Sequence, residues 1–247
     1  MSALLEVTGL SKRYGAIEAV RAVSFSVAAG EILGIIGPNG SGKTTLFNCI
    51  LGQAAPSAGT VRFRGIDLTG ASPLAVSRRG VGRTFQSLQV FGSLSVRDNL
   101  IVAAQELSGS MAARLLAPSD AGLGARVDAM IERFRLGAVA ALPAGNLSYG
   151  QQKLVDIAMA FMGEPALVLL DEPAAGIAPT LVEELRALLE GLNRDGGATF
   201  VVIEHNMDFV MGLAHRVLVL AEGHVLAEGS PNAVRDHPKV MEAYLGA

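Results

Sequence analysis

The stretch Gly-Pro-Asn-Gly-Ser-Gly-Lys-Thr, residues 37–44, constrains the fold of this chain more than any other segment. It matches the pattern Gly-x-x-x-x-Gly-Lys-[Ser/Thr] in full, follows the strand-like run EILGII and precedes a helix-like run. In that context glycines let backbone N–H groups curve around phosphate groups. The residues that we expect to bind nucleotide phosphates are Gly37, Pro38, Asn39, Gly40, Ser41, Gly42, Lys43, Thr44 and Thr45.

Two residues of this loop bring specific chemistry. Lys43 supplies a positive charge for the β- and γ-phosphates of a nucleotide, and we expect it to take part in catalysis. The Thr44 hydroxyl is a hard oxygen ligand of the kind that Mg²⁺ prefers. The sequence therefore predicts a site for a nucleotide together with Mg²⁺.

An acidic pair stands at the end of the buried-strand pattern ALVLLD. Because ligands bind at the carboxyl edge of parallel sheets, Asp171 is placed to hold Mg²⁺. Glu172 follows directly, and successive residues at a strand end point to different sides, so it can orient an attacking water molecule. The pair favours hydrolysis of the nucleotide over phosphoryl transfer to a second substrate.

Two further polar residues are candidates for the same site. We expect His205 to end the next buried strand, TFVVIEH, where a neutral imidazole would contact the γ-phosphate, although a single histidine is more often structural. Gln86 precedes a helical segment, and its amide oxygen is a possible ligand for Mg²⁺ or for the attacking water. The pattern alone leaves both roles open.

A second phosphate cradle is predicted at LSYGQQK, residues 147–153. Ser148 is placed as the N-cap of a helix whose apolar residues recur at helical spacing. The free N–H groups at such a helix start can bind an anion. Since the chain already has a phosphate loop far upstream, the purpose of this second cradle needs an explanation.

The remaining pattern predicts an α/β fold. Buried strands alternate with helices, which indicates a mainly parallel sheet, and the N-terminal segments LLEVTGL, VSFSV and TVRFRG are rich in strand-forming residues. From Leu88 to Met162 the composition is typical of helices. Glu222-Gly223 predicts a hairpin turn. A later amphipathic helix, residues 180–193, is expected to bury the stripe Leu181, Leu185, Leu188 and Leu192.

Composition limits the classes of partner. A net charge of −3 gives no electrostatic footprint for nucleic acid. The single cysteine, Cys49, cannot form an intramolecular disulfide, which fits a reducing compartment. No signal peptide pattern and no apolar run of about 20 residues is found, so we expect a soluble chain. The mean hydropathy of +0.41 fits either an Ala- and Leu-rich core or apolar surface that a partner covers.

Together these motifs resemble the ATP-binding subunits of ABC transporters over nearly the whole chain. The resemblance identifies LSYGQ as the family's signature sequence, which usually reads Leu-Ser-Gly-Gly-Gln. It implies that two subunits stack head to tail around two ATP molecules, so that the second cradle caps the ATP of the partner. The residues implied to contact the partner's ATP are Ser148, Tyr149, Gly150 and Gln151.

The implied fold is an α/β P-loop NTPase with a mainly parallel core sheet, an antiparallel β subdomain and an inserted helical subdomain. Within a single domain, residues 1–247, we assign residues 1–86 and 165–247 to the nucleotide-binding core. Residues 87–164 form the helical subdomain that carries the signature.

The resemblance also assigns residues that the patterns leave open. Gln86 becomes the hinge between core and helical subdomain, and Tyr14 becomes the aromatic that stacks on adenine, the alternative being ordinary packing at a sheet edge. Residues 87–100 become the groove for coupling helices of a permease, the alternative being plain subdomain core. Ala178 stands where the family usually has Asp, or Asn in a closer subfamily, which leaves the coupling between the two hydrolysis events open.

A closer resemblance is to the ATPases of branched-chain amino acid importers, on GRTFQ, LSYGQQ, DEPAAGIAP, IEHNMDFV and HPKVMEAYLG. Related importers of urea or other small organic solutes share these motifs. An exporter ATPase of the lipopolysaccharide type is disfavoured because its signature reads Gly-Gly. Soluble ABC ATPases of translation or DNA repair usually have paired ATPase units or long coiled coils, and GTPases have an Asn-Lys-x-Asp motif; this sequence has none of these.

The resemblance implies a set of partners. These are a second ATPase subunit (this chain or a related one), two transmembrane permease subunits and, indirectly, a periplasmic solute-binding protein. The expected location is the cytoplasmic face of the inner membrane, reached through the permease. The cargo does not contact this subunit, so its sequence leaves the cargo open.

Overall fold

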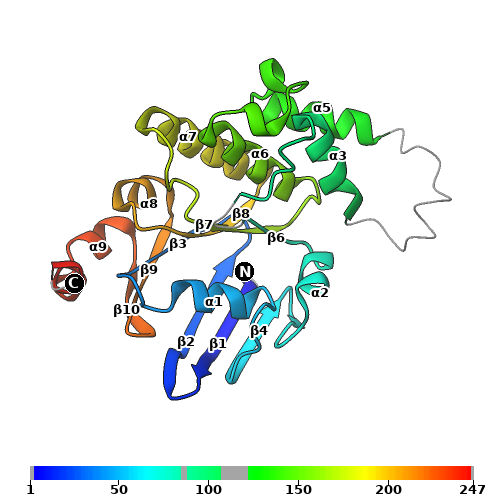
Figure 1. Cartoon of the computed structure of the whole chain (residues 1–247). Helices are drawn as coiled ribbons and strands as arrows, with labels where there is room; N and C mark the ends of the chain where they lie inside the picture. The colour runs from blue at the N-terminus through cyan, green and yellow to red at the C-terminus, as the bar shows by residue number, and fades with distance from the viewer. Residues whose placement is uncertain (1–2, 85–87, 107–121, 246–247) are drawn as a thin grey trace.

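A six-stranded sheet, parallel except at one edge, forms the centre of the molecule (Figure 1). The computed structural model describes residues 3–84, 88–106 and 122–245, so Gln86 lies outside the described residues. The strand order is β10-β9-β3-β8-β7-β6, with β10 antiparallel to β9. The strands are β3 Ile32–Ile36, β6 Val81–Arg83, β7 Leu167–Asp171, β8 Thr199–Ile203, β9 Arg216–Ala221 and β10 His224–Gly229.

A second, antiparallel sheet has the strand order β2-β1-β4-β5. Its strands are β1 Ala3–Tyr14, β2 Ile17–Ala28, β4 Ala58–Phe63 and β5 Ile66–Asp67. Along β2, Val23, Phe25 and Val27 are buried while the residues between them are exposed, as expected for a sheet with one face on the core. The predicted combination of a mainly parallel sheet with an antiparallel β unit is confirmed.

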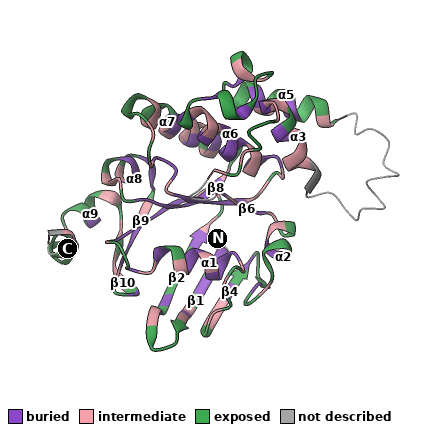
Figure 2. Cartoon of the chain, viewed as in Figure 1, coloured by how far each residue is buried: buried purple, intermediate pink, exposed green. Residues whose placement is uncertain are grey.

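Both faces of the six-stranded sheet are covered, which explains why its strands read as continuous apolar runs. On β3, Leu33 and Ile35 pack with α1 and the antiparallel sheet, whereas Ile32 and Ile36 pack with helices on the opposite face. Figure 2 shows the buried residues gathered along the sheet and on the helix sides that face it. The helices are α1 Lys43–Ile50, α2 Pro73–Arg78, α3 Val96–Glu106, α5 Leu123–Arg133, α6 Tyr149–Phe161, α7 Pro179–Gly196, α8 Met207–Leu213, α9 Pro231–Arg235 and α10 Pro238–Leu245.

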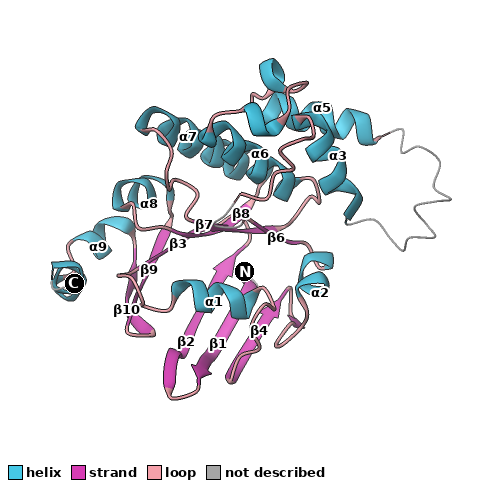
Figure 3. Cartoon of the chain, in the orientation of Figure 1, coloured by secondary structure: helices cyan, strands magenta, loops and turns pink. Residues whose placement is uncertain are grey.

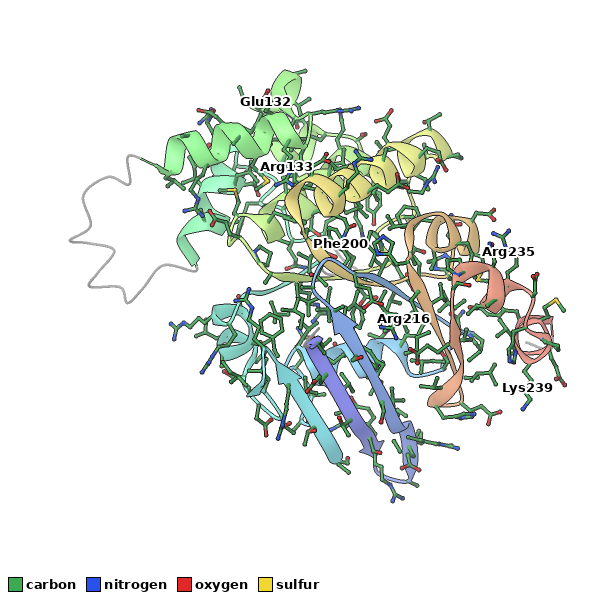
Figure 4. The ribbon with its side chains drawn as sticks, turned by 180° about the vertical axis from the view of Figure 1, so that it is seen from behind. Glu132, Arg133, Phe200, Arg216, Arg235 and Lys239 are labelled. Carbon is green, nitrogen blue, oxygen red and sulfur yellow. The ribbon has the colours of Figure 1, made fainter. Side chains whose placement is uncertain are left out.

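The helices α3, α5 and α6 pack together above the sheet (Figure 3). Aromatic rings connect them to it: Phe134 lies 5.8 Å from Phe161, and Phe161 lies 5.9 Å from Phe200 of β8, between ring centroids. Figure 4 shows Phe200 in the interior. These edge-tilted contacts anchor α6 to the strand that leads into the candidate site.

The predicted hairpin turn is confirmed, because Glu222 and Gly223 connect β9 to β10 with positive φ angles. The predicted amphipathic helix is α7, and burial along its apolar stripe is uneven. Leu185, Leu189 and Leu192 are buried, whereas Leu181 and Leu188 are only half-buried. Leu181 and Leu188 line a groove beside residues 133–139, and Leu188 also packs against the core.

Within the part of the chain that the structure describes, no helix is long and apolar enough to span a bilayer.

Candidate active site

The phosphate loop connects the end of β3 to the start of α1 at Lys43, as predicted. Two of its glycines are required by close backbone contacts. A Cβ atom at Gly37 would lie 2.1 Å from the Leu220 carbonyl oxygen, and one at Gly42 would lie 2.3 Å from the Ala19 carbonyl oxygen. Gly42 also has a φ of +100°. The neighbouring strands therefore hold both ends of the loop in one conformation.

Lys43 points back into the loop. Its ammonium donates hydrogen bonds to the carbonyl oxygens of Gly37 at 2.7 Å and Pro38 at 3.0 Å. Burial lowers the pKa of Lys43, and the negative charges of Glu172 and Asp171 oppose this. The lysine is thus a buried cation inside the loop, facing two carboxylates of the adjacent strand end.

The loop offers further groups that suit a phosphate. The Ser41 hydroxyl is buried and has no hydrogen-bond partner within the described residues. Asn39, Gly40 and Thr44 are exposed, so a ligand can reach them. A buried hydroxyl without a partner, a buried cation and backbone N–H groups at a helix start together fit the phosphate groups of a nucleotide.

Asp171 is the last residue of β7 and is buried, as the sequence indicated. Its backbone N–H donates to the Thr84 hydroxyl at 3.4 Å, which ties the end of β7 to the end of β6. Burial raises the pKa of the Asp171 carboxyl, and the Arg83 guanidinium opposes that rise. The carboxylate therefore lies in a sheltered position beside the loop, where a bound cation would favour its ionised form.

Glu172 lies just outside β7 in a left-handed backbone conformation, with a φ of +48°. Its N–H donates to the Ile203 carbonyl of β8 at 2.9 Å. One carboxylate oxygen, Oε1, lies 3.7 Å from Nδ1 of His205. A positive φ at a residue with a side chain is uncommon and gathers at functional sites. The turn separates the two acids: Asp171 is buried, whereas Glu172 is partly exposed.

His205 does not end its strand, contrary to the prediction. β8 ends at Ile203, and the next residue, Glu204, explains the early end. The Glu204 carboxylate is fully buried and accepts hydrogen bonds from three backbone N–H groups: Ala174 at 2.7 Å, His205 at 3.0 Å and Asn206 at 3.2 Å. It thereby joins the loop after β7 to the loop after β8.

Sequence reasoning missed Glu204. The available signal was a charged residue directly after the apolar run Phe-Val-Val-Ile, where a buried acid needs several hydrogen-bond donors.

The acidic residues also constrain any metal site. Among the described residues no group of three or more His, Cys, Asp or Glu side chains could hold a metal ion. Thr44 and Asp171 remain as oxygen donors beside the loop. This small set fits Mg²⁺, which is commonly held by one or two carboxylates together with substrate phosphates. Gln86, the other metal candidate, lies outside the described residues.

The second cradle is a helix start, as predicted. α6 begins at Tyr149, and Ser148 caps it by accepting from the Gln151 N–H at 3.4 Å, while Gln151 Oε1 accepts from the Ser148 N–H at 3.1 Å. This capping box fixes the entry to the helix. Ser148 and Tyr149 are exposed, so this end of α6 is accessible from outside.

Tyr149 and Gly150 pack against the segment that follows β7. The Tyr149 ring lies beside Gly176, where a Cβ atom would be 3.2 Å from its Cε1. A Cβ atom at Gly150 would lie 2.0 Å from a methyl carbon of Leu181 on α7. A side chain at position 150 would therefore require the end of the Leu181 side chain to shift. Ala178, the N-cap of α7, provides no side-chain cap.

The structure does not bring the two cradles together. α1 lies on one face of the six-stranded sheet and α6 on the other (Figure 1). In the described residues no hydrogen bond or ion pair joins residues 148–151 to residues 37–44. The start of α6 thus belongs to a separate surface of the molecule.

Tyr14 lies at the end of β1 with its side chain about half exposed, at 49%. It pairs with Ile17, the first residue of β2. That strand continues to Ala19, whose carbonyl oxygen lies against Gly42. The ammonium of Lys12 lies 4.8 Å from the Tyr14 ring centroid. The tyrosine is therefore on a segment that touches the phosphate loop and offers a ring for stacking.

A groove of about 560 Å³ lies between α2, β6, α3 and α6. Gln89 and the exposed ring of Phe91 line it, in the segment that was predicted as a groove, and Asp156 of α6 forms part of its wall. The Gln89 N–H donates to Asp156 Oδ1 at 3.1 Å. This bond fastens the segment that follows Gln86 to α6.

Asp156 should make stability depend on pH. Burial raises the pKa of its carboxyl to about 6. Because the folded-state pKa lies above the ordinary value of 3.8, keeping the group ionised costs about 3 kcal/mol well above pH 6, and the cost is absent below about pH 4. Asp156→Asn keeps an acceptor for Gln89 but cannot ionise. The free energy of unfolding is measured in urea from pH 5 to pH 8 for the variant and the wild type. The variant's value minus that of the wild type should increase as pH rises. A difference that stays constant would contradict this.

The chain is similar to known proteins over nearly its whole length. Residues 20–175 match the family model described as ABC transporter, and residues 224–247 match the model described as branched-chain amino acid ATP-binding cassette transporter. The chain is 37% identical to the high-affinity branched-chain amino acid transport ATP-binding protein BraF of Pseudomonas aeruginosa, over 98% of each chain.

Solved structures agree with the sequence match. A nucleotide-free ATP-binding cassette from an ABC transporter is similar with a TM-score of 0.89 and 33% identity, over 100% of both chains. A dimeric cassette in a post-hydrolysis state, bound to ADP and phosphate, is similar with a TM-score of 0.79 and 25% identity, over 92% of this chain and 98% of that one.

Proposed function

Because this chain belongs to the ATP-binding family of ABC transporters, we propose that it hydrolyses ATP to drive an importer of branched-chain amino acids. The cargo assignment is supported by the name of the relative and by the match of residues 224–247. The observation that carries the reaction is the meeting of Lys43, Asp171 and the Glu172–His205 pair at one edge of the sheet.

In the proposed reaction the phosphate loop binds the ATP phosphates through its N–H groups and the Ser41 hydroxyl. Lys43 exchanges its bonds to the Gly37 and Pro38 carbonyls for phosphate oxygens. Thr44, Asp171 and Gln86 would hold Mg²⁺, which when bound neutralises phosphate charge. Tyr14 would stack on the adenine.

Glu172 is proposed to orient the attacking water. The water attacks the γ-phosphorus as the bond from that phosphorus to the β-phosphate oxygen breaks, and Glu172 accepts a hydrogen bond from the water. His205, 3.7 Å from Glu172, would contact the γ-phosphate and report its loss.

The active form is proposed to be a dimer that encloses two ATP molecules. The start of α6, with Ser148, Tyr149, Gly150 and Gln151, would cap the ATP bound by the phosphate loop of the partner. Its exposure and its separation from the loop of the same chain support this, as does the dimeric cassette with ADP and phosphate. The second subunit is this chain or a related one.

We further propose that residues 87–164 move as a helical subdomain against a core of residues 1–86 and 165–247. A permease would seat in the groove lined by Gln89 and Phe91, and it would hold the chain at the cytoplasmic face of the membrane. A periplasmic binding protein would select the cargo without touching this chain.

Purification of the tagged chain from detergent-solubilised native membranes tests this function. Mass spectrometry should identify two permease-type membrane proteins, a second ATPase and a binding protein, whose ligand is then determined with a panel of amino acids and urea. Phe91→Glu places a charge on the exposed wall of the groove and should lose the permease proteins. Exclusively cytosolic partners would overturn the transport role, and a urea-specific binding protein would overturn the cargo.

A further inference from the structure

Two exposed apolar side chains line the groove between α2, β6, α3 and α6. Leu74 of α2 is 52% exposed, and Phe91, in the segment between β6 and α3, is 45% exposed. Large apolar side chains that line a concave surface are typical of a place where another molecule binds. The groove therefore fits a partner that brings apolar side chains of its own.

Two buried polar side chains hold the Phe91 wall of this groove in place. Asn99 of α3 is fully buried; its Oδ1 accepts from the Phe91 N–H at 2.7 Å, and its amide donates to the carbonyl oxygens of Phe91 at 3.1 Å and Ser95 at 2.9 Å. The Gln89 N–H is bonded to Asp156 Oδ1 of α6. A wall that is fixed before a partner arrives lowers the entropic cost of binding.

Among the described residues that line the groove, Asp156 is the only acid. It is 5% exposed, and its second oxygen, Oδ2, is buried without a hydrogen-bond partner in the described part of the chain. Burial raises the pKa of its carboxyl to about 6, and the Gln89 N–H and the Lys153 charge oppose that rise. A carboxylate can accept several hydrogen bonds, so a buried one that accepts a single bond calls for another donor.

The nearby cations of this chain do not supply that donor. Lys153 stands three residues before Asp156 on α6, but its ammonium is itself buried without a hydrogen-bond partner among the described residues. Arg83, the only described cation that lines the groove, donates through Nε to the Thr84 carbonyl oxygen at 3.3 Å, and the Asp171 carboxylate acts on it. The place of the donor at Asp156 is therefore open to a partner.

We propose that Asp156 determines which permease this chain accepts: the permease segment in the groove carries an Arg or Lys side chain, flanked by apolar side chains, that donates to the Asp156 carboxylate. The inference rests on the proposed function, which seats a permease in this groove. The apolar neighbours would pack on Leu74 and Phe91. Because a turn about χ2 exchanges the two carboxylate oxygens, the cation can bond to one oxygen while the other stays on the Gln89 N–H.

The first test measures how this chain binds the permease proteins recovered in the purification above, held in vesicles and stripped of their ATPases with urea. Asp156→Asn keeps the shape and the acceptor for Gln89 but removes the charge, so the Kd should rise at least about tenfold. Asp236→Asn, at the exposed end of α9, is the matched control and should bind like the wild type. Equal binding by Asp156→Asn, as expected if Lys153 alone serves the carboxylate, overturns the proposal.

A second test keeps Asp156 in place and changes the permease. Each Lys and Arg of its cytoplasmic loops is replaced singly by Met. One replacement should raise the Kd of the wild-type chain at least about tenfold, yet add less than about twofold to the Kd of Asp156→Asn. If no replacement weakens binding, or if every loss adds in full to that of Asp156→Asn, the proposal is overturned. Failure of the wild-type chain itself to bind the vesicles would instead refute the transport role on which the inference rests.

Discussion

Glu172→Gln is expected to abolish most ATP hydrolysis while leaving ATP binding intact. The amide has nearly the shape of the carboxylate but accepts a hydrogen bond from water more weakly, so kcat should fall by at least about 100-fold. Since the phosphate loop and the signature helix are unchanged, the ATP-bound dimer should form and persist. Phosphate release gives kcat, and size-exclusion chromatography with and without ATP gives the oligomeric state.

Glu132→Gln is the matched control, because Glu132 is an exposed residue of α5 (Figure 4). It should hydrolyse ATP like the wild type and dimerise only transiently. A Glu172→Gln protein that stays monomeric at high ATP would contradict the proposed enclosure of nucleotide between two chains. One that hydrolyses at the wild-type rate would remove Glu172 from the mechanism.

Lys43→Ala should lose both affinity and turnover. The ammonium is buried inside the loop and is the cation nearest to where the β- and γ-phosphates would lie, so its loss removes charge-assisted hydrogen bonds in the ground state and in the transition state. We expect the Kd for ATP to rise at least about tenfold and kcat/KM to fall by about 100-fold or more. Fluorescent nucleotide titration and phosphate release measure the two effects.

Lys239→Ala is the control for charge, because Lys239 is exposed on α10. Its nucleotide affinity and turnover should match those of the wild type. Unchanged turnover in Lys43→Ala would mean that the phosphate loop has been assigned to the wrong segment. The Tm of both variants checks that the loop remains folded.

The parts of the site that depend on local geometry were predictable from sequence. Gly42 supplies the positive φ at the start of the helix, Lys43 opens the helix, and the capped start at Ser148 follows from its residue types. Asp171 ends a buried strand, which the apolar run before it indicates. Each of these positions is determined by residues within a few places along the chain.

The parts that depend on tertiary contacts were not predictable. Glu204 is satisfied by N–H groups from a loop 30 residues away, and no local pattern reveals that contact. The apolar face of α7 is visible in its spacing, but which of its leucines the core covers fully (Leu185, Leu189 and Leu192) depends on the elements packed against it. Lys153 reads as an ordinary surface lysine of an amphipathic helix until the sheet below it is seen.

The crowding of Gly150 by Leu181 bears on how genetic variants of this chain should be interpreted. A side chain at position 150 would displace the Leu181 side chain of the same subunit, in addition to any effect on nucleotide bound by the partner. Loss of transport in an organism carrying such a variant would therefore have two separable causes, one of folding and one of catalysis. Replacing Leu181 by a smaller residue in the same chain would relieve the first cause alone. The loss of transport that remains then measures the contribution of Gly150 to the reaction.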